Sequence, residues 1–221
     1  MSDTDSFIEE VTEEVRRDRL FLMMRRYGWI AILAVLLLVG GAAYNEYRKS
    51  QARVAAQNLG DSIITALEGD APADRAAALQ AISTENAGGQ AVLRLLTANE
   101  LVAAGQSAEA ATAFEAIATD ADLPEIYRQI ASYKALVQRG KDTDIATRRT
   151  GFEALATPGS SLRLLAEEQL ALIALESGDA EDAITRLQAI IVDSEVTPGL
   201  RQRASQLIVA LGGTPQQVAG G

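Results

Sequence analysis

The stretch from Ala98 to Asp120, ANELVAAGQSAEAATAFEAIATD, has an internal match further along the chain. The matching stretch, from Ala171 to Asp193, reads ALIALESGDAEDAITRLQAIIVD, and it aligns Gly178 with Gly105 of the first stretch. On both sides of each glycine the apolar residues recur with the spacing of a helix. Each stretch therefore predicts two helices joined by a turn.

Five glycines extend this pattern to the chain from residue 59 onward. They recur about every 36 residues, the period of a helical hairpin repeat, and they are Gly69, Gly105, Gly140, Gly178 and Gly212. Each follows a segment with one apolar stripe, so we expect each to end a helix in a left-handed conformation. A single hairpin cannot bury its own apolar face, and the period therefore predicts a stack of about four hairpins followed by a helix from Leu200 to Leu211.

The internal match spans two of these periods, because Gly140 lies between Gly105 and Gly178. We call the alignment of Gly105 with Gly178, extended along the chain in both directions, the two-hairpin offset. The small residues Ala110 and Ala183, which it aligns, should let paired helices approach closely. Phe114 and Leu187, which it also aligns, should fill the space between hairpins.

Helix start signals fall between the apolar segments. We expect helices to begin at residues that provide a side-chain cap or a first-turn proline, namely Pro72, Ser107, Asp122, Asp179 and Thr197.

A membrane-spanning helix is predicted near the N-terminus. Nineteen residues without charge lie between Arg26 and Glu46, and at about 1.5 Å per residue they reach roughly 28 Å, close to the thickness of a bilayer core. Aromatic residues occur at both ends, as expected at the membrane interface. The alternative is a cleaved secretory signal ending near Gly41-Ala42-Ala43, which the seven acidic residues before Tyr27 disfavour.

The basic residues predict the orientation of this helix. Five arginines precede it, whereas only Arg48, Lys49 and Arg53 follow it closely. The excess of positive charge places the N-terminus in the cytoplasm and the larger part of the chain in the periplasm. The apolar residues Phe7, Ile8, Val11 and Val15 predict an amphipathic helix within residues 1–26, either as an extension of the anchor or as a docking helix.

Composition limits the chemistry available to the chain. It has 30 acidic and 20 basic side chains, no histidine and no cysteine, which removes imidazole catalysis, thiol nucleophiles and zinc clusters. The negative charge disfavours nucleic acid as a partner. We therefore expect a protein that is not an enzyme, with no catalytic, cofactor-binding or metal-binding residue and no cofactor.

Four local features were weighed against this expectation. Glu167 and Glu168 point about 100° apart on a helix and are expected to be solvated rather than catalytic. Serine–lysine catalysis has only Lys49, Lys134 and Lys141 to draw on. Gly88-Gly89-Gln90 matches the tripeptide of peptide-release factors, but a loop and helix start account for it. Gly40 to Ala43 allows a partner helix to pack closely, or is ordinary helix sequence.

For a binding function, a stack of hairpins provides an extended concave surface, and its acidic excess favours basic or mixed-charge clients. Six arginines form either a complementary patch or scattered solvated charges: Arg128, Arg139, Arg148, Arg149, Arg201 and Arg203. No pocket can be assigned from the sequence.

The segment Gly178-Asp179-Ala180-Glu181-Asp182-Ala183-Ile184 resembles the turn of tetratricopeptide repeats. Leu170 and Ala171 suit the large and small positions of the preceding helix, although Glu167 and Ala174 stand where the repeat usually has aromatic residues. The whole layout is similar to the bacterial inner-membrane, tetratricopeptide-like family known as the ancillary subunit of the Sec translocon. This resemblance implies a periplasmic repeat domain that associates with the translocon and with periplasmic chaperones, and it implies no catalytic residues.

Together these patterns predict an all-α protein with an N-terminal transmembrane helix and a tetratricopeptide-like α-solenoid. We divide it into a cytoplasmic segment (1–26), a transmembrane helix embedded in the lipid bilayer (27–45), a repeat domain (46–211) and a flexible tail (212–221). The expected function is an interaction module of the bacterial inner membrane that assists exported proteins through translocon subunits or periplasmic chaperones. The alternative is a scaffold for another envelope complex, in cytochrome maturation or cell division.

Overall fold

The computed structural model describes the backbone of residues 3–216, and their side chains except those of residues 3–23, 31 and 141. The predicted amphipathic face at Phe7 to Val15 lies outside the described side chains, and residues 217–221 of the predicted tail lie outside the described residues. By internal contacts the chain divides into two units, Met1–Asn58 and Leu59–Gly221. Residues 46–58, which the sequence-based division assigns to the repeats, belong to the first unit.

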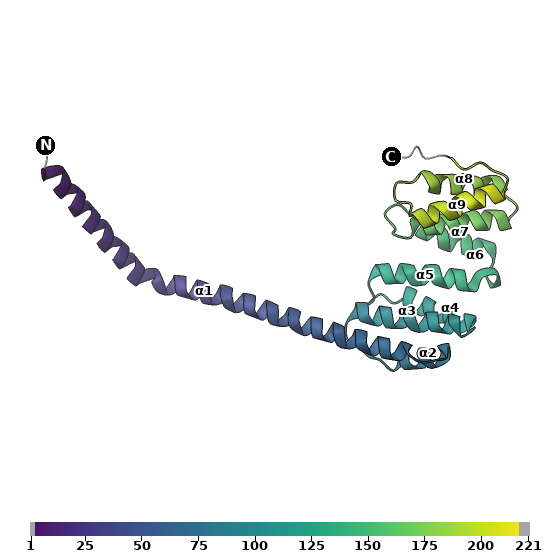
Figure 1. The fold of residues 1–221 in the computed structure, drawn as a ribbon, viewed down its shortest axis with the longest axis horizontal. Coiled ribbons are helices and arrows are strands. Elements are labelled where there is room, and N and C mark those ends of the chain that lie inside the picture. Colours follow the sequence, from purple (N-terminus) through teal and green to yellow (C-terminus); the bar gives the residue numbers. More distant parts are fainter. Residues whose placement is uncertain (1–2, 217–221) are drawn as a thin grey trace. The chain divides into compact units, whose positions relative to one another are not determined.

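The described chain is all helical and contains no strand, which confirms the predicted all-α class. The helices are α1 (Asp3–Leu67), α2 (Pro72–Gln80), α3 (Ala87–Ala103), α4 (Ser107–Ala118), α5 (Glu125–Arg139), the short 3₁₀ helix η1 (Gly140–Asp142), α6 (Ile145–Leu155), α7 (Arg163–Glu176), α8 (Ala180–Val192) and α9 (Pro198–Ala210). In the unit Leu59–Gly221 the helices follow one another in chain order (Figure 1), and each packs against its neighbours in sequence.

Helix α1 contains the predicted membrane span. Within the described residues, Met24–Leu67 is the one stretch of helix that is long and apolar enough to cross a bilayer. Its apolar side chains between Met24 and Val39 are exposed wherever they are described. Because exposed aliphatic side chains are stable in lipid and not in water, this part of α1 is compatible with a single membrane crossing.

Side-chain caps fix several helix starts. Asp179 accepts a hydrogen bond from the Asp182 amide at 2.9 Å, and Thr197 accepts one from Leu200. These two caps and the first-turn Pro72 are confirmed. The caps predicted at Ser107 and Asp122 are wrong.

Both wrong caps have a local structural reason. Ser107 is already the first helical residue, and Gln106 precedes it without a side-chain bond. After Asp122 the chain buries Leu123 before Pro124 takes the capping position, so α5 begins later than a capping carboxylate would require. Asn86 and Asp144, which were not among the predicted caps, cap α3 and α6 by accepting hydrogen bonds from first-turn amides.

Four of the five predicted glycine terminators have positive φ angles: Gly105, Gly140, Gly178 and Gly212. Gly69 is the exception, because α1 ends without a left-handed residue and the Gly69 carbonyl accepts a hydrogen bond from Arg75 instead. After Gly140 the extra residues of the third period form η1.

The unit Leu59–Gly221 has four apolar clusters, each built by three successive helical segments. The first joins the end of α1 to α2 and α3, the second joins α3, α4 and α5, the third joins α5, α6 and α7, and the fourth joins α7, α8 and α9. Helices α3, α5 and α7 therefore contribute to two clusters each. No hairpin closes its core without the helix that follows it.

The two-hairpin offset seen in the sequence extends through this unit. Under it, helix starts coincide at residues 72 and 145, 107 and 180, and 125 and 198, and α3 and α7 end at residues 103 and 176. Phe114 and Leu187, which the offset superimposes, are both fully buried between helices. Two pairs of hairpins are thus built on one plan.

Replacing Gly178 with Ala should lower the free energy of unfolding by about 1–2 kcal/mol, because its φ of 82° is a left-handed conformation that a β-carbon disfavours. The matched control is Gly60→Ala within α1, where an added β-carbon meets open space and should raise stability by about 0.5–1 kcal/mol. Urea unfolding of the full chain in detergent, followed by circular dichroism, measures both. Equal effects of the two substitutions would contradict the assignment of Gly178 as a helix terminator.

Candidate protein-interaction surface

Side-chain hydrogen bonds join helices that are two apart in the chain. Lys134 of α5 donates to Asn99 of α3 at 2.9 Å, and Gln169 of α7 donates to the Tyr133 hydroxyl of α5 at 3.2 Å. Arg203 of α9 binds both oxygens of Glu168 of α7 at 2.8 and 2.9 Å. The partners are 35, 36 and 35 residues apart. The side of the unit formed by α3, α5, α7 and α9 is therefore linked from one hairpin to the next.

Aliphatic residues recur on the same helices at the interval that separates Asn99 from Lys134: Val102, Val137, Leu172 and Leu207. Val137 and Leu172 are 42% and 38% exposed. Both line a small groove of about 80 Å³ between α5, α6 and α7. Together with the polar bonds, these side chains form what we call the first-helix surface, meaning the exposed side of α3, α5, α7 and α9 that carries Asn99, Lys134, Val137, Gln169 and Leu172.

Arg148 supports the groove from α6. It is only 8% exposed, and its Nη2 donates to both carboxylate oxygens of Glu176 on α7 at 2.8 and 2.7 Å, while Nε donates to the Thr143 carbonyl. Arg75, its counterpart under the two-hairpin offset, binds Glu100 of α3 and the Gly69 carbonyl in a similar way. In both halves, an arginine in the first turn of the second helix of a hairpin (α2 or α6) binds a backbone carbonyl in the turn before that helix. The same arginine also binds a carboxylate near the end of the following helix (α3 or α7).

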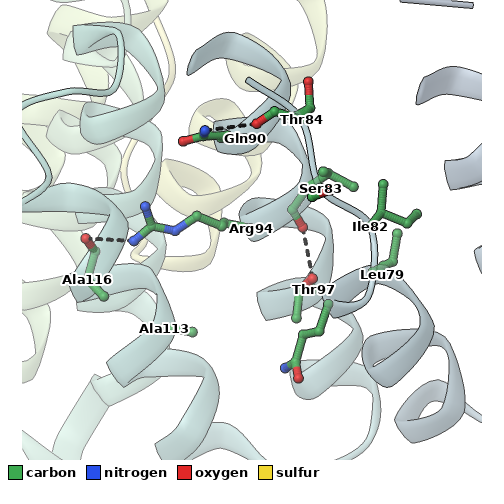
Figure 2. A pocket seen from close by; sticks show the side chains of 11 residues that line it. Leu79, Ile82, Ser83, Thr84, Gln90, Arg94, Thr97, Ala113 and Ala116 are labelled. Carbon is green, nitrogen blue, oxygen red and sulfur yellow. Dashed lines mark hydrogen bonds between the residues drawn. The ribbon is translucent and has the colours of Figure 1, made fainter. Parts of the chain in front are cut away.

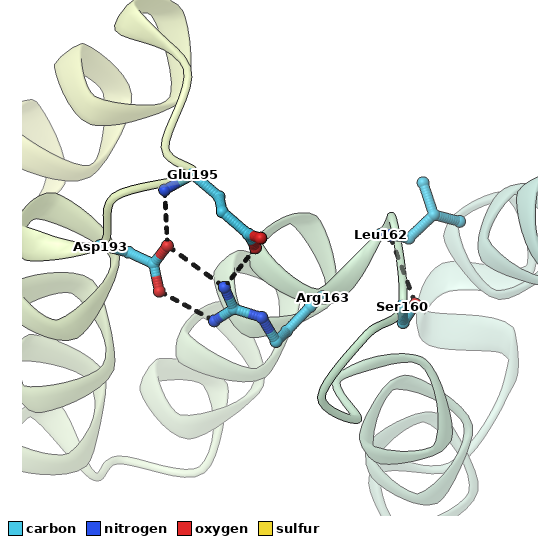
Figure 3. Close-up of polar contacts among 5 residues, drawn as sticks. All are labelled: Ser160, Leu162, Arg163, Asp193 and Glu195. Atoms are coloured by element: carbon cyan, nitrogen blue, oxygen red, sulfur yellow. Dashed lines mark hydrogen bonds and ion pairs between the residues drawn. The ribbon is translucent and has the colours of Figure 1, made fainter.

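Another ion pair holds the end of α8. Arg163 donates to both oxygens of Asp193 at 2.9 and 3.1 Å and to Glu195 at 2.8 Å, and the Glu195 amide also donates to Asp193 (Figure 3). Arg94 and Asp120 form a similar pair after α4, at 2.6 Å, with the Asp122 amide as a second donor. The hydrogen bond from the paired arginine is the main cause that lowers the pKa of Asp120 and of Asp193.

The six arginines singled out from the sequence do not gather in one free basic patch, because half of them form ion pairs with carboxylates of other helices. Arg139 pairs with Glu115, Arg148 with Glu176 and Arg203 with Glu168, each across two helices. Arg128 and Arg201, which the two-hairpin offset aligns, both have a buried Nε without a hydrogen-bond partner in the described structure. The ion pairs join helices, which sequence spacing alone cannot reveal because the partners are distant along the chain.

The prediction that Glu167 and Glu168 are solvated is also wrong. Glu167 accepts a hydrogen bond from Arg186 of α8 at 2.8 Å, whereas Glu168 is 7% exposed and binds Arg203 of α9. The two carboxylates face different helices, as their adjacent positions on α7 require. They act as structural anchors on two sides of α7.

The remaining residues of interest have structural roles. Lys134 lies 5.5 Å from the centre of the Phe114 ring in addition to its bond with Asn99. Gly89 lies in the first turn of α3, where an added β-carbon would come within 2.8 Å of the end of the Leu59 side chain, so a larger residue there would displace that side chain. The side chain of Lys141 lies outside the description. Within the described residues, no cluster of three acidic side chains is arranged to hold a metal ion.

Charge is distributed unevenly between the two units. Met1–Asn58 carries eight acidic and eight basic side chains, whereas Leu59–Gly221 carries 22 acidic and 12 basic ones, so the net charge of −10 belongs to the second unit. In the described part of that unit, seven arginines form ion pairs with nine of the acidic side chains. More than half of its carboxylates thus form no ion pair with the described side chains, and they give the surface a negative potential.

These features define an all-helical protein with one candidate membrane helix and a unit of short helices linked by ion pairs. No protein-family model matches the chain, and no curated protein or solved structure matches it. Its function has to be argued from its own residues.

Replacing Arg163 with Gln should lower the thermal unfolding midpoint at pH 7, because it removes the charged partner of Asp193. A carboxyl whose folded-state pKa is lowered contributes stability above its unfolded pKa of about 3.9, and this contribution is lost as the pH falls through the lower folded-state pKa. The difference between wild type and variant should therefore shrink below about pH 4.

Arg149→Gln is the control, since Arg149 forms no ion pair within the described residues. Thermal unfolding of the full chain in detergent, followed by circular dichroism between pH 3 and pH 7, measures all three proteins. A difference for Arg163→Gln that is as large at pH 3 as at pH 7 would contradict the role of the ion pair.

Proposed function

We propose that this chain is a membrane-anchored protein-interaction module whose hairpins form a tetratricopeptide-like solenoid. About four hairpins, from the end of α1 to α8, are followed by the terminal helix α9. The observation that carries the proposal is the set of hydrogen bonds between alternate helices at intervals of 35 or 36 residues. Bonds repeated at the hairpin period are the arrangement that translation of one unit along a stack produces.

The first-helix surface is the proposed binding face. It combines exposed Val137 and Leu172 with polar side chains already held in place by hydrogen bonds across the hairpins. Because such side chains lose little freedom on binding, they suit recognition of a partner segment. The acidic excess of the unit favours clients with basic or mixed-charge segments.

The anchor defines where this module works. Residues 27–45 of α1 lie in the candidate span and are proposed to cross the bacterial inner membrane once, with the N-terminus in the cytoplasm and α2–α9 in the periplasm. In this setting the module serves as an accessory factor of the Sec translocon that hands exported proteins to periplasmic chaperones. The resemblance of the layout to the translocon-associated family supports this assignment.

A photo-crosslinking residue placed at Val137 or Leu172 in living cells should capture translocon subunits, periplasmic chaperones or exported clients. Val192, an exposed aliphatic residue at the end of α8, is the matched control because it lies on a second helix and is 52% exposed. Mass spectrometry identifies the captured proteins. Equal capture at Val192, or products that contain neither translocon subunits nor chaperones nor exported clients, would contradict the proposal, and capture of cytochrome-maturation or division proteins would favour the scaffold alternative.

Alkaline phosphatase fused at Ser62 should be active in a bacterial host, since the positive-inside bias places everything after the span in the periplasm. Green fluorescent protein fused at the same residue should be dark, because it does not fold after export through the translocon in its unfolded form. The reverse pair of results would invert the topology.

A further inference from the structure

A cavity of about 450 Å³ lies between α2, α3 and α4. Leu79, Ile82 and Leu93 line its apolar side, where Leu79 and Leu93 are buried and Ile82 is partly exposed. Ala113 and Ala116 of α4 border the cavity on the side away from Ile82 (Figure 2). This volume falls in the range of small-ligand pockets. The cavity-lining residues of α3, such as Leu93 and Thr97, stand on the face of that helix opposite to Asn99, so the cavity is separate from the first-helix surface.

The rim of the cavity includes a non-helical loop with free backbone amides. Residues 82–84 have no helical structure, and in the described part of the chain the amides of Ser83 and Thr84 have no hydrogen-bond acceptor. The Thr84 carbonyl accepts a bond from the Gln90 side chain at 2.9 Å, which holds the loop against α3. Free amides on a non-helical loop held in place at the rim can donate to the backbone carbonyls of an extended segment that enters the cavity.

The cavity is electrically neutral. No acidic residue lines it, and the only charged lining group, Arg94, is neutralised by Asp120 at 2.6 Å and donates to the Ala116 carbonyl at 3.2 Å. A charged ligand group would lose its hydration here without gaining a counter-charge. Uncharged aliphatic groups would bury apolar surface at no such cost.

Comparison of the two halves explains why this space is open. Under the two-hairpin offset, Ala113 corresponds to Arg186 and Arg94 corresponds to Glu167. Arg186 of α8 reaches across to Glu167 of α7 at 2.8 Å and covers the corresponding region with an ion pair. In the first half an alanine replaces that arginine, so the side chain that would cross the space is missing.

We propose that the cavity between α2, α3 and α4 binds an extended, uncharged peptide segment with aliphatic side chains. One or two aliphatic side chains enter between Ile82 and the alanines Ala113 and Ala116, and the peptide carbonyls accept hydrogen bonds from the free amides of Ser83 and Thr84. This site extends the proposed function, since it lies on the second-helix side and does not depend on the first-helix surface.

The test uses the full chain in lipid nanodiscs and a fluorescein-labelled, capped nonapeptide, Gly-Ser-Gly-Leu-Val-Leu-Gly-Ser-Gly. Fluorescence anisotropy measures binding, with empty nanodiscs as the background and a peptide with an Asp-Ser-Asp centre as the specificity control. Ala116→Leu places a larger side chain in the cavity and should weaken binding at least tenfold. Ala189→Leu, at the corresponding exposed position of α8 outside the cavity, should leave binding unchanged.

Ala113→Leu provides a second cavity-filling variant should Ala116→Leu unfold, and thermal midpoints of all variants report folding. Loss of peptide binding in a folded cavity variant, with Ala189→Leu unaffected, supports the site. No binding to wild type above the nanodisc background, equal binding of both peptides, or equal binding by Ala116→Leu and Ala189→Leu would overturn it. None of these results bears on crosslinking from Val137 or Leu172, so the two proposals fail independently.

Discussion

The unit Leu59–Gly221 depends on helices that are shared between neighbouring apolar clusters. In α3, Ala91, Leu95 and Ala98 face the cluster with α4 and α5, whereas Leu93 faces the cluster with α2. Neither cluster is expected to be stable by itself, because each of its outer helices buries its remaining apolar residues against the neighbouring cluster. Each hairpin is therefore expected to be stabilised by its contact with the next hairpin. The fully buried alanines at the helix crossings let the helices approach closely enough to make this contact.

Ion pairs determine how neighbouring helices of this apolar stack are aligned along their axes. Alanine-rich crossings are small and smooth, so apolar packing alone leaves neighbouring helices free to slide by a turn. Arginine pairs such as Arg148 with Glu176 and Arg163 with Asp193 fix the register because each is bidentate or shared with a backbone carbonyl. They also use most of the described arginines of the unit, and the carboxylates that remain set its negative surface potential.

The sequence predicted the features that depend on local spacing. Helix positions, the left-handed conformation of Gly105 and Gly178, and the caps at Asp179 and Thr197 follow from residues within one turn of each other. The cap at Asp122 failed because burial of Leu123 delays the helix, which is a tertiary effect. The ion pairs of Glu167 and Glu168 were missed for the same reason, since their partners come from two different later helices.

The two-hairpin offset also shows how a repeated plan can diverge without losing its fold. Several fully buried positions keep their apolar character in both halves, as Phe114 and Leu187 do, because a change there disturbs two helices at once, whereas buried Leu95 and Thr97 of the first half align with Glu168 and Leu170. Positions on the side of the unit formed by the second helices of the hairpins are less restricted in the side chains that they can have. Arg186 with Glu167 covers this region in the second half, while Ala113 with Arg94 leaves it open in the first, and Arg94 finds its counter-charge in Asp120 instead. The two halves therefore keep the same order of helices while they differ in how this outer region is filled.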